Sequence, residues 1–304
     1  MISVIIPSFN RATMLVRCIK ALLASNDADF EIVAIDDCSS EDVRGVLSES
    51  KVLDDPRVRL LRNETNLQLG RSRARGADAA KGDLLLFLDD DNLVEPDMLA
   101  LMAKEFATNP RLGLLAPMAI HVNGPKDGRI WTLGSDFNRL TSSPSDFAAG
   151  LPLAELPRDR TLFPTLYSPN AFMVHKETYT QVGGFDFDLP FYYDDADFGW
   201  RIAKLGYENR ILSTARTYHQ NFMTSSDAME LRQLGINAPW KAYRLARNRF
   251  RFVRKHFPLP NMLLVFFVFA PLSAVFYCAK ALSNRRPDIA FAYLRGTFAG
   301  LLMF

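Results

Sequence analysis

Residues 84–92, Leu84-Leu85-Leu86-Phe87-Leu88-Asp89-Asp90-Asp91-Asn92, are the most informative segment of this 304-residue chain for its fold. Its first five residues are all apolar, as expected of a strand that is buried on both faces of a parallel sheet. Three carboxylates follow the strand without a break. Because ligands of open α/β sheets bind beyond the carboxyl ends of the strands, the sequence predicts an acidic ligand site at this point.

Three shorter β-rich runs precede this strand, at Ser3–Ile6, Glu31–Ile35 and Val58–Leu61. Helical stretches separate them, and one helical face is formed by apolar residues at helical spacing, namely Met14, Leu15, Cys18, Ile19, Leu22 and Leu23. Such alternation predicts an α/β fold with a mainly parallel sheet flanked by helices.

The second half of the chain is less regular at first. Residues 121–164 are rich in Gly, Pro, Ser and Asp, which predicts long loops with an edge hairpin. Order returns with a strand at Ala171–His175, a helix from Lys176, an amphipathic helix around Ala196–Leu205 and a strand at Ile211–Tyr218.

The Asp89-Asp90-Asp91 run is the main candidate metal site. Adjacent ionised carboxylates repel one another, and a hard divalent cation such as Mg²⁺ or Mn²⁺ relieves that repulsion with oxygen ligands. We expect Asp89 and Asp91 to point the same way, since they stand two apart at a strand end. The alternative is a solvated acidic turn or a helix cap.

Two further acidic pairs have both a functional and a structural interpretation. Asp37 ends the second strand, where a carboxylate can accept from a nucleobase or a ribose, or can simply cap the next helix. Asp195 lies between an aromatic run and a helix, where it can act as a general base towards a hydroxyl. Acidic residues are, however, favoured in any first helical turn.

Basic groups and a histidine complete the candidate site. Arg71, Arg73 and Arg75 stand at the start of the helix that precedes the buried strand, where arginines can neutralise diphosphate or hold the acidic cluster. A solvated basic face is the competing interpretation. His219 follows the strand at 211–218 and can complete a cation site, although a lone histidine is commonly structural.

Several other functions are excluded. The first turn, Pro7-Ser8-Phe9-Asn10, contains no glycine, so the dinucleotide fingerprint of dehydrogenases is absent. A formal net charge of +2 gives no global field that favours nucleic acid, and we expect no nucleic-acid partner. Three cysteines without zinc-ligand spacing favour a reducing compartment.

In this order, the motifs resemble the inverting family-2 glycosyltransferases of the GT-A fold. The resemblance covers residues 2–220. It rests on the segments Ser3–Arg11, Glu31–Ser40, Asn66–Gly82, Leu86–Asn92, Val182–Asp186 and Asp194–Asp197.

The resemblance implies a role for each matching position. It places a nucleotide sugar against Pro7, Ser8, Asn10, Asp37, Arg73, Asp89 and Asp90. In the DxD motif, Asp91 would be the principal metal ligand, with Asp89 and, by the argument above, His219. Asp195 matches the carboxylate that deprotonates the acceptor. The sequence departs from the family in the loop before the buried strand, where Gln68 and Ala74 replace the usual Gly and Asn.

The resemblance also implies a reaction. A sugar would pass with inversion from a UDP-, GDP- or dTDP-sugar to a hydroxyl of a lipid-linked or cell-surface glycan, with Mg²⁺ or Mn²⁺ as cofactor. A polyprenyl-phosphate sugar synthase and a non-catalytic sugar-nucleotide binder are the alternatives.

The C-terminal third suggests a membrane. We expect a catalytic domain over 1–220, basic connector helices over 221–256 and a hydrophobic membrane-associated segment over 257–304. Lys241–His256 mixes Arg and Lys with aromatics, which suits an anionic lipid surface. Phe257–Ala279 is uncharged and long enough to span. Because basic residues flank both ends, an in-plane hairpin is favoured over a span, and a soluble packed helix remains an alternative. The expected location is the cytoplasmic face of a membrane.

Overall fold

The computed structural model describes residues 1–304 except 27, 124–125, 158, 221–228 and 304. The first eight residues of the predicted connector 221–256 therefore lie outside the described residues. Contacts divide the chain into two compact units. Unit 1 comprises 1–136, 146–190 and 194–222, and unit 2 comprises 137–145, 191–193 and 223–304. The predicted three-part division stays a prediction.

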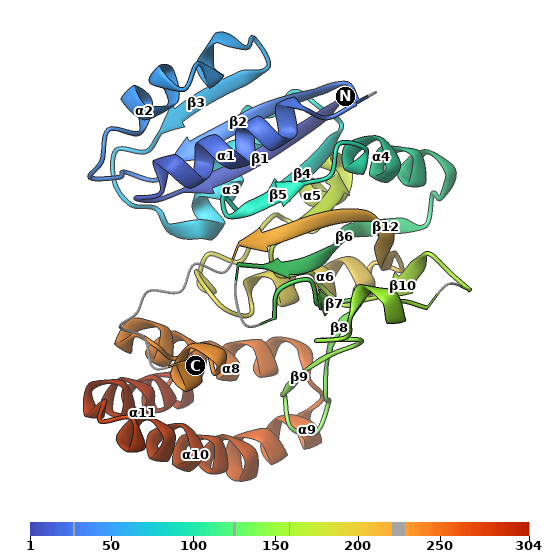
Figure 1. The fold of residues 1–304 in the computed structure, drawn as a ribbon. Coiled ribbons are helices and arrows are strands. Elements are labelled where there is room, and N and C mark those ends of the chain that lie inside the picture. Colours follow the sequence, from blue (N-terminus) through green and yellow to red (C-terminus); the bar gives the residue numbers. More distant parts are fainter. Residues whose placement is uncertain (27, 124–125, 158, 221–228, 304) are drawn as a thin grey trace. The chain divides into compact units, whose positions relative to one another are not determined.

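The first half of unit 1 is a parallel βαβ array (Figure 1). Strands β1 (Ile2–Ser8), β2 (Phe30–Asp36), β3 (Val58–Arg62) and β4 (Leu84–Leu88) pair in parallel in the order β4-β1-β2-β3. They are joined by α1 (Ala12–Leu23), α2 (Val43–Glu49) with the short helix η1 (Val52–Asp54), and α3 (Gln68–Ala79). The strands predicted from the sequence coincide with these four.

The second half of unit 1 makes the sheet mixed. Its strands are β5 (Asn92–Val94), β6 (Leu112–Val122), β10 (Leu162–Pro164), β11 (Ala171–His175) and β12 (Glu208–Gln220). β11 runs antiparallel to β4 and joins it to β6, and β12 pairs in parallel with β6. The mixed, mainly parallel sheet flanked by helices confirms the predicted fold class.

The sheet is buried on both faces, as the apolar run of β4 indicates. Leu86 and Leu88 pack into a core with α1, α2 and α4 (Met98–Thr108), whereas Leu85 and Phe87 pack into a second core with α3, α5 (Lys176–Gln181) and α6 (Asp194–Lys204). This three-layer arrangement places all the parallel strand ends at one edge of the sheet.

The region predicted as long loops contains more structure than expected. β7 (Ile130–Thr132) pairs with β6, while β8 (Ser135–Phe137) and β9 (Pro144–Asp146) form a separate two-stranded sheet. The short helix η2 (Leu153–Glu155) follows. These strands are only three residues long, too short to give the alternating pattern on which a strand prediction depends.

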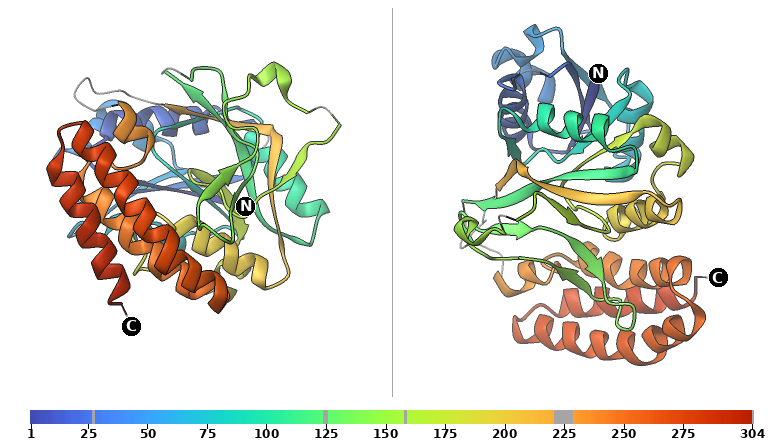
Figure 2. Two further views of the ribbon diagram at one scale, coloured as in Figure 1. Left: turned by 90° about the horizontal axis from the view of Figure 1, so that it is seen from below. Right: turned by 90° about the vertical axis from the view of Figure 1, so that its right-hand side faces the viewer.

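Unit 2 is helical and contains α7 (Met229–Gln233), α8 (Pro239–His256), α9 (Leu259–Leu264), the π-helical turn η3 (Val265–Phe269), α10 (Ala270–Ser283) and α11 (Pro287–Leu301). The π-helical turn directly precedes Pro271, which lacks a backbone N–H and disturbs the ladder of the preceding turn. The views in Figure 2 agree that α10 and α11 run side by side.

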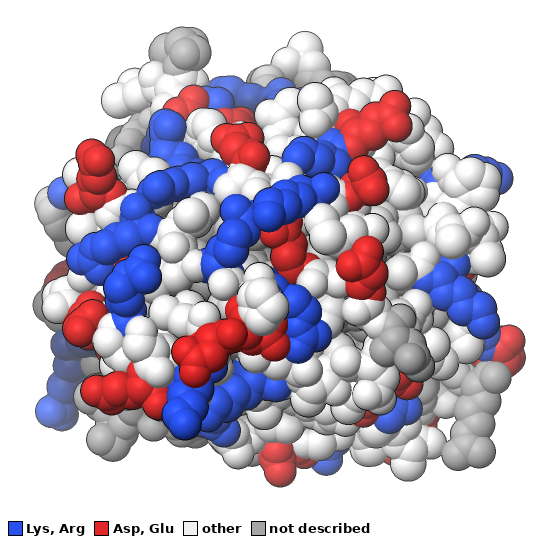
Figure 3. All heavy atoms as spheres, turned by 90° about the horizontal axis from the view of Figure 1, so that it is seen from above, with Lys and Arg blue, Asp and Glu red and all other residues white. Residues whose placement is uncertain are grey.

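Charged side chains are mixed over the face drawn in Figure 3, where basic and acidic groups lie among one another. That face therefore carries no extended field of one sign.

Candidate active site

The ends of the parallel strands bring the acidic motif against the first turn. β1 lies between β2 and β4, so its last residue, Ser8, lies close to the ends of both neighbouring strands. The Ser8 hydroxyl donates to Asp90 Oδ2 at 2.6 Å. Pro7 is buried beside Ile35, and the backbone N–H of Asn10 donates to Ser39 Oγ at 2.8 Å. These contacts hold the first turn against the acidic strand ends.

Arg73 is the central cation of the site. Its side chain on α3 is fully buried, and it rests on the rings of Phe172 and Phe185, each 5.6 Å from the guanidinium carbon. Nη1 donates to Asp195 Oδ1 at 2.6 Å and Nη2 to Asp89 Oδ1 at 2.9 Å. One guanidinium therefore fixes the distance between the carboxylates of α6 and of the β4 end.

Three carboxylates share this guanidinium, since Asp194 Oδ2 also lies 3.7 Å from Arg73 Nη1. Burial opposes the charge of Arg73, but Asp195, Asp89 and Asp194 outweigh it and raise its pKa. Burial raises the pKa of Asp195 well above its usual range, with Asp194 and Asp89 adding to the rise and Arg73 opposing it. The result is a carboxylate that is unusually ready to take a proton, as a general base requires.

A second ion-pair cluster lies beside the first. Arg11 Nη1 donates to Asp90 Oδ1 at 3.1 Å and to Asp91 Oδ2 at 3.0 Å. Burial, together with the charge of Asp91, raises the pKa of Asp90 to about 6 against the attraction of Arg11. For Asp91, burial is outweighed by His219 and Arg11, and its pKa is lowered. Asp91 is therefore the member of the triplet that stays charged most readily.

The fit of a divalent cation rests on Asp91 and His219. His219 Nδ1 lies 3.3 Å from Asp91 Oδ1, and it is buried without a hydrogen-bond partner of good geometry. Strand β12 brings the two together, since Gln220 N donates to Asp91 O at 2.9 Å. A carboxylate oxygen suits both Mg²⁺ and Mn²⁺, whereas an imidazole nitrogen suits a transition metal, so the pair fits Mn²⁺ best. Within the described residues no three His, Cys, Asp or Glu side chains form a metal cage, so phosphate or water would complete the shell.

The side chain of Asp89 differs from the expectation. Asp89 and Asp91 do not point the same way, because Asp89 contacts Arg73 while Asp91 contacts Arg11 and His219. The strand ends at Leu88, so the alternation of a strand no longer applies to the turn that follows. The role of Asp89 as a second metal ligand stays a prediction.

The Asp37 carboxylate accepts hydrogen bonds that order the loop before α3. Its Oδ1 accepts from Asn63 Nδ2 at 2.6 Å and from the backbone N–H of Leu67 at 2.8 Å. Its Oδ2 accepts from Gln68 N at 2.8 Å. Gln68 has a φ of 69°, in the left-handed region that favours glycine, at the position where the family usually has one. The carboxylate thus orders the start of α3, and its predicted contact with a base stays a prediction.

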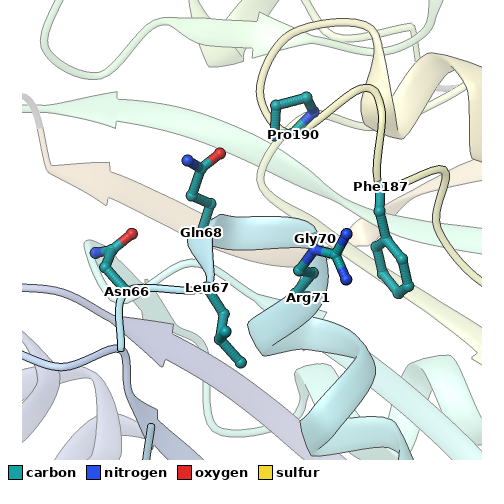
Figure 4. A pocket seen from close by; sticks show the side chains of 7 residues that line it. All are labelled: Asn66, Leu67, Gln68, Gly70, Arg71, Phe187 and Pro190. Carbon is teal, nitrogen blue, oxygen red and sulfur yellow. The ribbon is translucent and has the colours of Figure 1, made fainter. Parts of the chain in front are cut away.

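A cavity of about 310 Å³ opens beside this loop (Figure 4). It is lined by Asn66, Leu67, Gln68, Gly70, Arg71, Phe187 and Pro190. The guanidinium of Arg71 lies 4.4 Å from the ring centre of Phe187. Arg71 therefore forms part of the wall of this cavity. The alternative interpretation from the sequence was that it belongs to a solvated basic face.

Sequence reasoning missed two participants. Arg11 neutralises Asp90 and Asp91, and its position directly after the first strand turn was the available signal. Asn170 donates to Asn92 Oδ1 at 2.8 Å, and Asn92 Nδ2 donates to Asp89 O at 3.1 Å. This bond pair supports the turn that carries the triplet, but a lone asparagine far along the chain gives no signal by itself.

The fold and the comparisons together define the class. A solved structure titled as GalNAc-T7 with UDP, GalNAc and Mn²⁺ superposes on 94% of this chain and 58% of that chain, with a TM-score of 0.63 and 17% sequence identity. At that identity the match speaks for the fold, and the fold is that of GT-A glycosyltransferases.

Two family models match the sequence, "Glycosyl transferase family 2" over residues 3–144 and "Glycosyl transferase family group 2" over residues 84–303. The chain belongs to the family-2 glycosyltransferases. The family membership that the motifs indicated is thereby confirmed.

Curated relatives agree with this assignment. An uncharacterized glycosyltransferase of Haemophilus influenzae is 36% identical over 115 residues, covering 38% of this chain and 37% of that protein. A GalNAc(5)-diNAcBac-PP-undecaprenol beta-1,3-glucosyltransferase of Campylobacter jejuni is 35% identical over 105 residues, covering 34% of each. The alignments of the first two relatives span 37% and 61% of their lengths, less than two thirds.

Proposed function

We propose that this chain transfers a sugar, with inversion, from a nucleoside-diphosphate donor to a hydroxyl of a lipid-linked or cell-surface glycan at a membrane. The observation that carries the proposal is the bridge from Asp195 through Arg73 to Asp89. It joins a carboxylate with a raised pKa to the acidic strand end where the donor would bind.

Asp195 is the proposed general base. As the acceptor oxygen attacks the anomeric carbon, its proton passes to the carboxylate of Asp195, and the bond from that carbon to the phosphate oxygen breaks. The diphosphate leaves with the bonding electrons. A single displacement of this kind inverts the anomeric centre. Arg73 holds the base in place from within the core and opposes the rise in its pKa.

The residues at the strand ends would hold the donor. Asp91 and His219 would hold Mg²⁺ or Mn²⁺, and a cation bound there would supply Lewis-acid stabilisation of the departing diphosphate. Pro7, Ser8 and Asn10 form the first turn beside them. The carboxylates around Arg73 and Arg11 outnumber the guanidiniums by five to two. This surplus of negative charge supports the binding of a cation with the diphosphate.

The acceptor and the location rest on relatives and on unit 2. The Campylobacter jejuni relative is named for an undecaprenol-linked acceptor, and a Rhizobium meliloti relative is named as a succinoglycan biosynthesis protein. Leu259–Ser283 is long and apolar enough to cross a membrane, and its most apolar stretch of 18 residues has a mean hydropathy of 2.3. The membrane location is supported by the length and composition of this segment. These features and the names of the relatives fit an enzyme that works on lipid-linked or surface glycans.

A donor panel tests the proposal. The full-length protein is incubated with UDP-, GDP- and dTDP-sugars, Mn²⁺ and a polyprenyl-diphosphate-linked glycan, and the product is examined by NMR. Metal-dependent transfer with the anomeric configuration opposite to that of the donor is expected. Retention of configuration would overturn the mechanism. Transfer to bare polyprenyl phosphate alone would point to a polyprenyl-phosphate sugar synthase, and binding without transfer to a non-catalytic binder.

A further inference from the structure

We propose that unit 2 docks in the plane of an anionic lipid bilayer through one apolar face formed by α9, η3, α10 and α11, and that the segment 259–283 does not span the membrane. The inference deepens the membrane part of the proposed function. Its test measures membrane binding and topology directly, so its failure leaves the transfer reaction open, and the reverse also holds.

The apolar face consists of large side chains that the rest of the chain leaves exposed. On α9, η3 and α10 they are Leu259, Leu263, Phe267, Val268, Leu272, Val275, Phe276 and Leu282. On α11 they are Phe291, Leu294 and Phe298, and Leu302 follows directly after the end of the helix. The α11 members follow one another at intervals of three and four residues, which places them on one side of the helix. An exposed apolar surface of this extent marks an interaction site.

The opposite sides of the same helices are buried within unit 2. Ala274 and Ala281 of α10 share a core cluster with Ile289 and Tyr293 of α11. The rings of Tyr277 and Tyr293 stack at 4.7 Å. These helices are therefore amphipathic in their packing, with one side in the core of the unit and the other side exposed.

α11 packs against α8, which is itself rich in Lys and Arg. A Cβ at Gly296 would collide with the Tyr243 carbonyl of α8, and a Cβ at Gly300 would lie 2.5 Å from the Phe250 ring, so α11 packs directly on the backbone of α8. Arg254 also donates to Gly300 O at 2.6 Å and to Leu301 O at 2.8 Å.

This packing argues against a span. α8 carries seven Lys and Arg residues between 239 and 256 and runs directly into α9. At its other end α10 is held by Lys280, whose Nζ lies 2.6 Å from Glu230 Oε1 of α7. A span by α9–α10 would pull these charged helices towards the hydrocarbon or break their packing. Lying in the interface satisfies both the apolar face and the charged helices.

The charge of the unit identifies the partner. Residues 223–304 contain twelve Lys and Arg but three Asp and Glu. Arg285 and Arg295 are exposed on the segment that carries the apolar face. A basic, amphipathic helical unit is complementary to a bilayer rich in anionic lipid, and its binding should fall as anionic lipid is removed or salt is added.

Vesicle flotation tests the lipid contact. The full chain is mixed with vesicles of phosphatidylcholine alone or with roughly 30% phosphatidylglycerol, whose negative surface attracts basic residues. We expect at least about tenfold stronger binding to the anionic vesicles, and about tenfold loss in Phe291→Glu and in Phe298→Glu. Leu205→Glu, an exposed leucine of unit 1, is the matched control and should bind as the wild type. Circular dichroism and melting verify that each variant folds.

Cysteine labelling tests the topology. Lys255→Cys and Ser283→Cys, at exposed polar positions that flank the two ends of the apolar segment, are made singly in a chain without its native cysteines, and an impermeant maleimide is added to oriented membrane vesicles. Labelling of both positions from the same side is expected. Labelling from opposite sides would show a span and overturn the inference. Absence of vesicle binding, or a dimer that Phe298→Glu dissociates without any effect on lipid binding, would overturn it as well.

Discussion

Asp90 gives the prediction whose size follows most directly from the structure. Its side chain is buried at the end of β4, and burial with the charge of Asp91 raises its pKa to about 6 from 3.8. The folded state therefore holds the proton more tightly than the unfolded state, so this group stabilises the fold below pH 3.8 and loses that contribution as the pH rises through 6. Two pKa units correspond to about 3 kcal/mol.

Asp90→Asn removes this titration and keeps one oxygen, which can accept from Ser8 or from Arg11 but not from both. We expect the free energy of unfolding of the variant, relative to the wild type, to rise by about 2–3 kcal/mol between pH 4 and pH 8. Urea denaturation in EDTA measures it, and Mn²⁺ should reduce the difference because a cation stabilises the charged form. A difference that stays constant over this range would refute the reasoning.

Four further variants test the site around it. Arg73→Lys keeps one charge but cannot bridge two carboxylates, so kcat should fall about 10²-fold. Because Arg73 lowers the pKa of Asp195, the acid limb of its pH profile should also move to higher pH. An acid limb at the same pH as in the wild type would show that Arg73 does not influence the pKa of the general base. Asp91→Asn and His219→Ala should each weaken Mn²⁺ binding about 10-fold or more, as measured by electron paramagnetic resonance without substrate. Equal affinity in either variant would remove that residue from the metal site. Asp37→Ala leaves the N–H groups of Leu67 and Gln68 without their acceptor and should lower the free energy of unfolding by about 1–3 kcal/mol. A melting curve like that of the wild type would show that the Asp37 carboxylate does not stabilise the loop before α3.

The sequence was sufficient for the parts of the fold that depend on local pattern. β4 is apolar at every position because it is covered on both faces, and that pattern alone places the acidic triplet at the end of a central strand. The order of the motifs then identified the family. Arg73 and Asp195 were both found in this way, although they lie 122 residues apart and nothing local indicates that they touch.

Directions of side chains after the strand ends could not be predicted. The turn after Leu88 separates Asp89 from Asp91, and its geometry depends on Asn92 and on Asn170 of the turn before β11. The orientation of Asp37 depends in the same way on Asn63 and on the loop before α3. These are tertiary hydrogen bonds between segments that are distant in the sequence. Hydrophobic periodicity predicts helices and strands but not contacts of this kind.

The pairing of the two helices in unit 2 was also beyond the sequence. The hydropathy of 259–283 is the same whether the segment spans a bilayer or lies in it. What distinguishes the two is the close approach of Gly296 and Gly300 to α8, and that approach is visible only in the packed structure.

The most direct test of the account is the transfer rate of Asp195→Asn at saturating donor and acceptor. Asparagine keeps the shape and an acceptor for Arg73 but cannot take the proton, so we expect kcat to fall 10²- to 10⁴-fold with little change in donor affinity. Asp78→Asn, an exposed aspartate on α3, should retain full activity. If Asp195→Asn transfers sugar as fast as the wild type, Asp195 is not the base and the proposed mechanism is wrong.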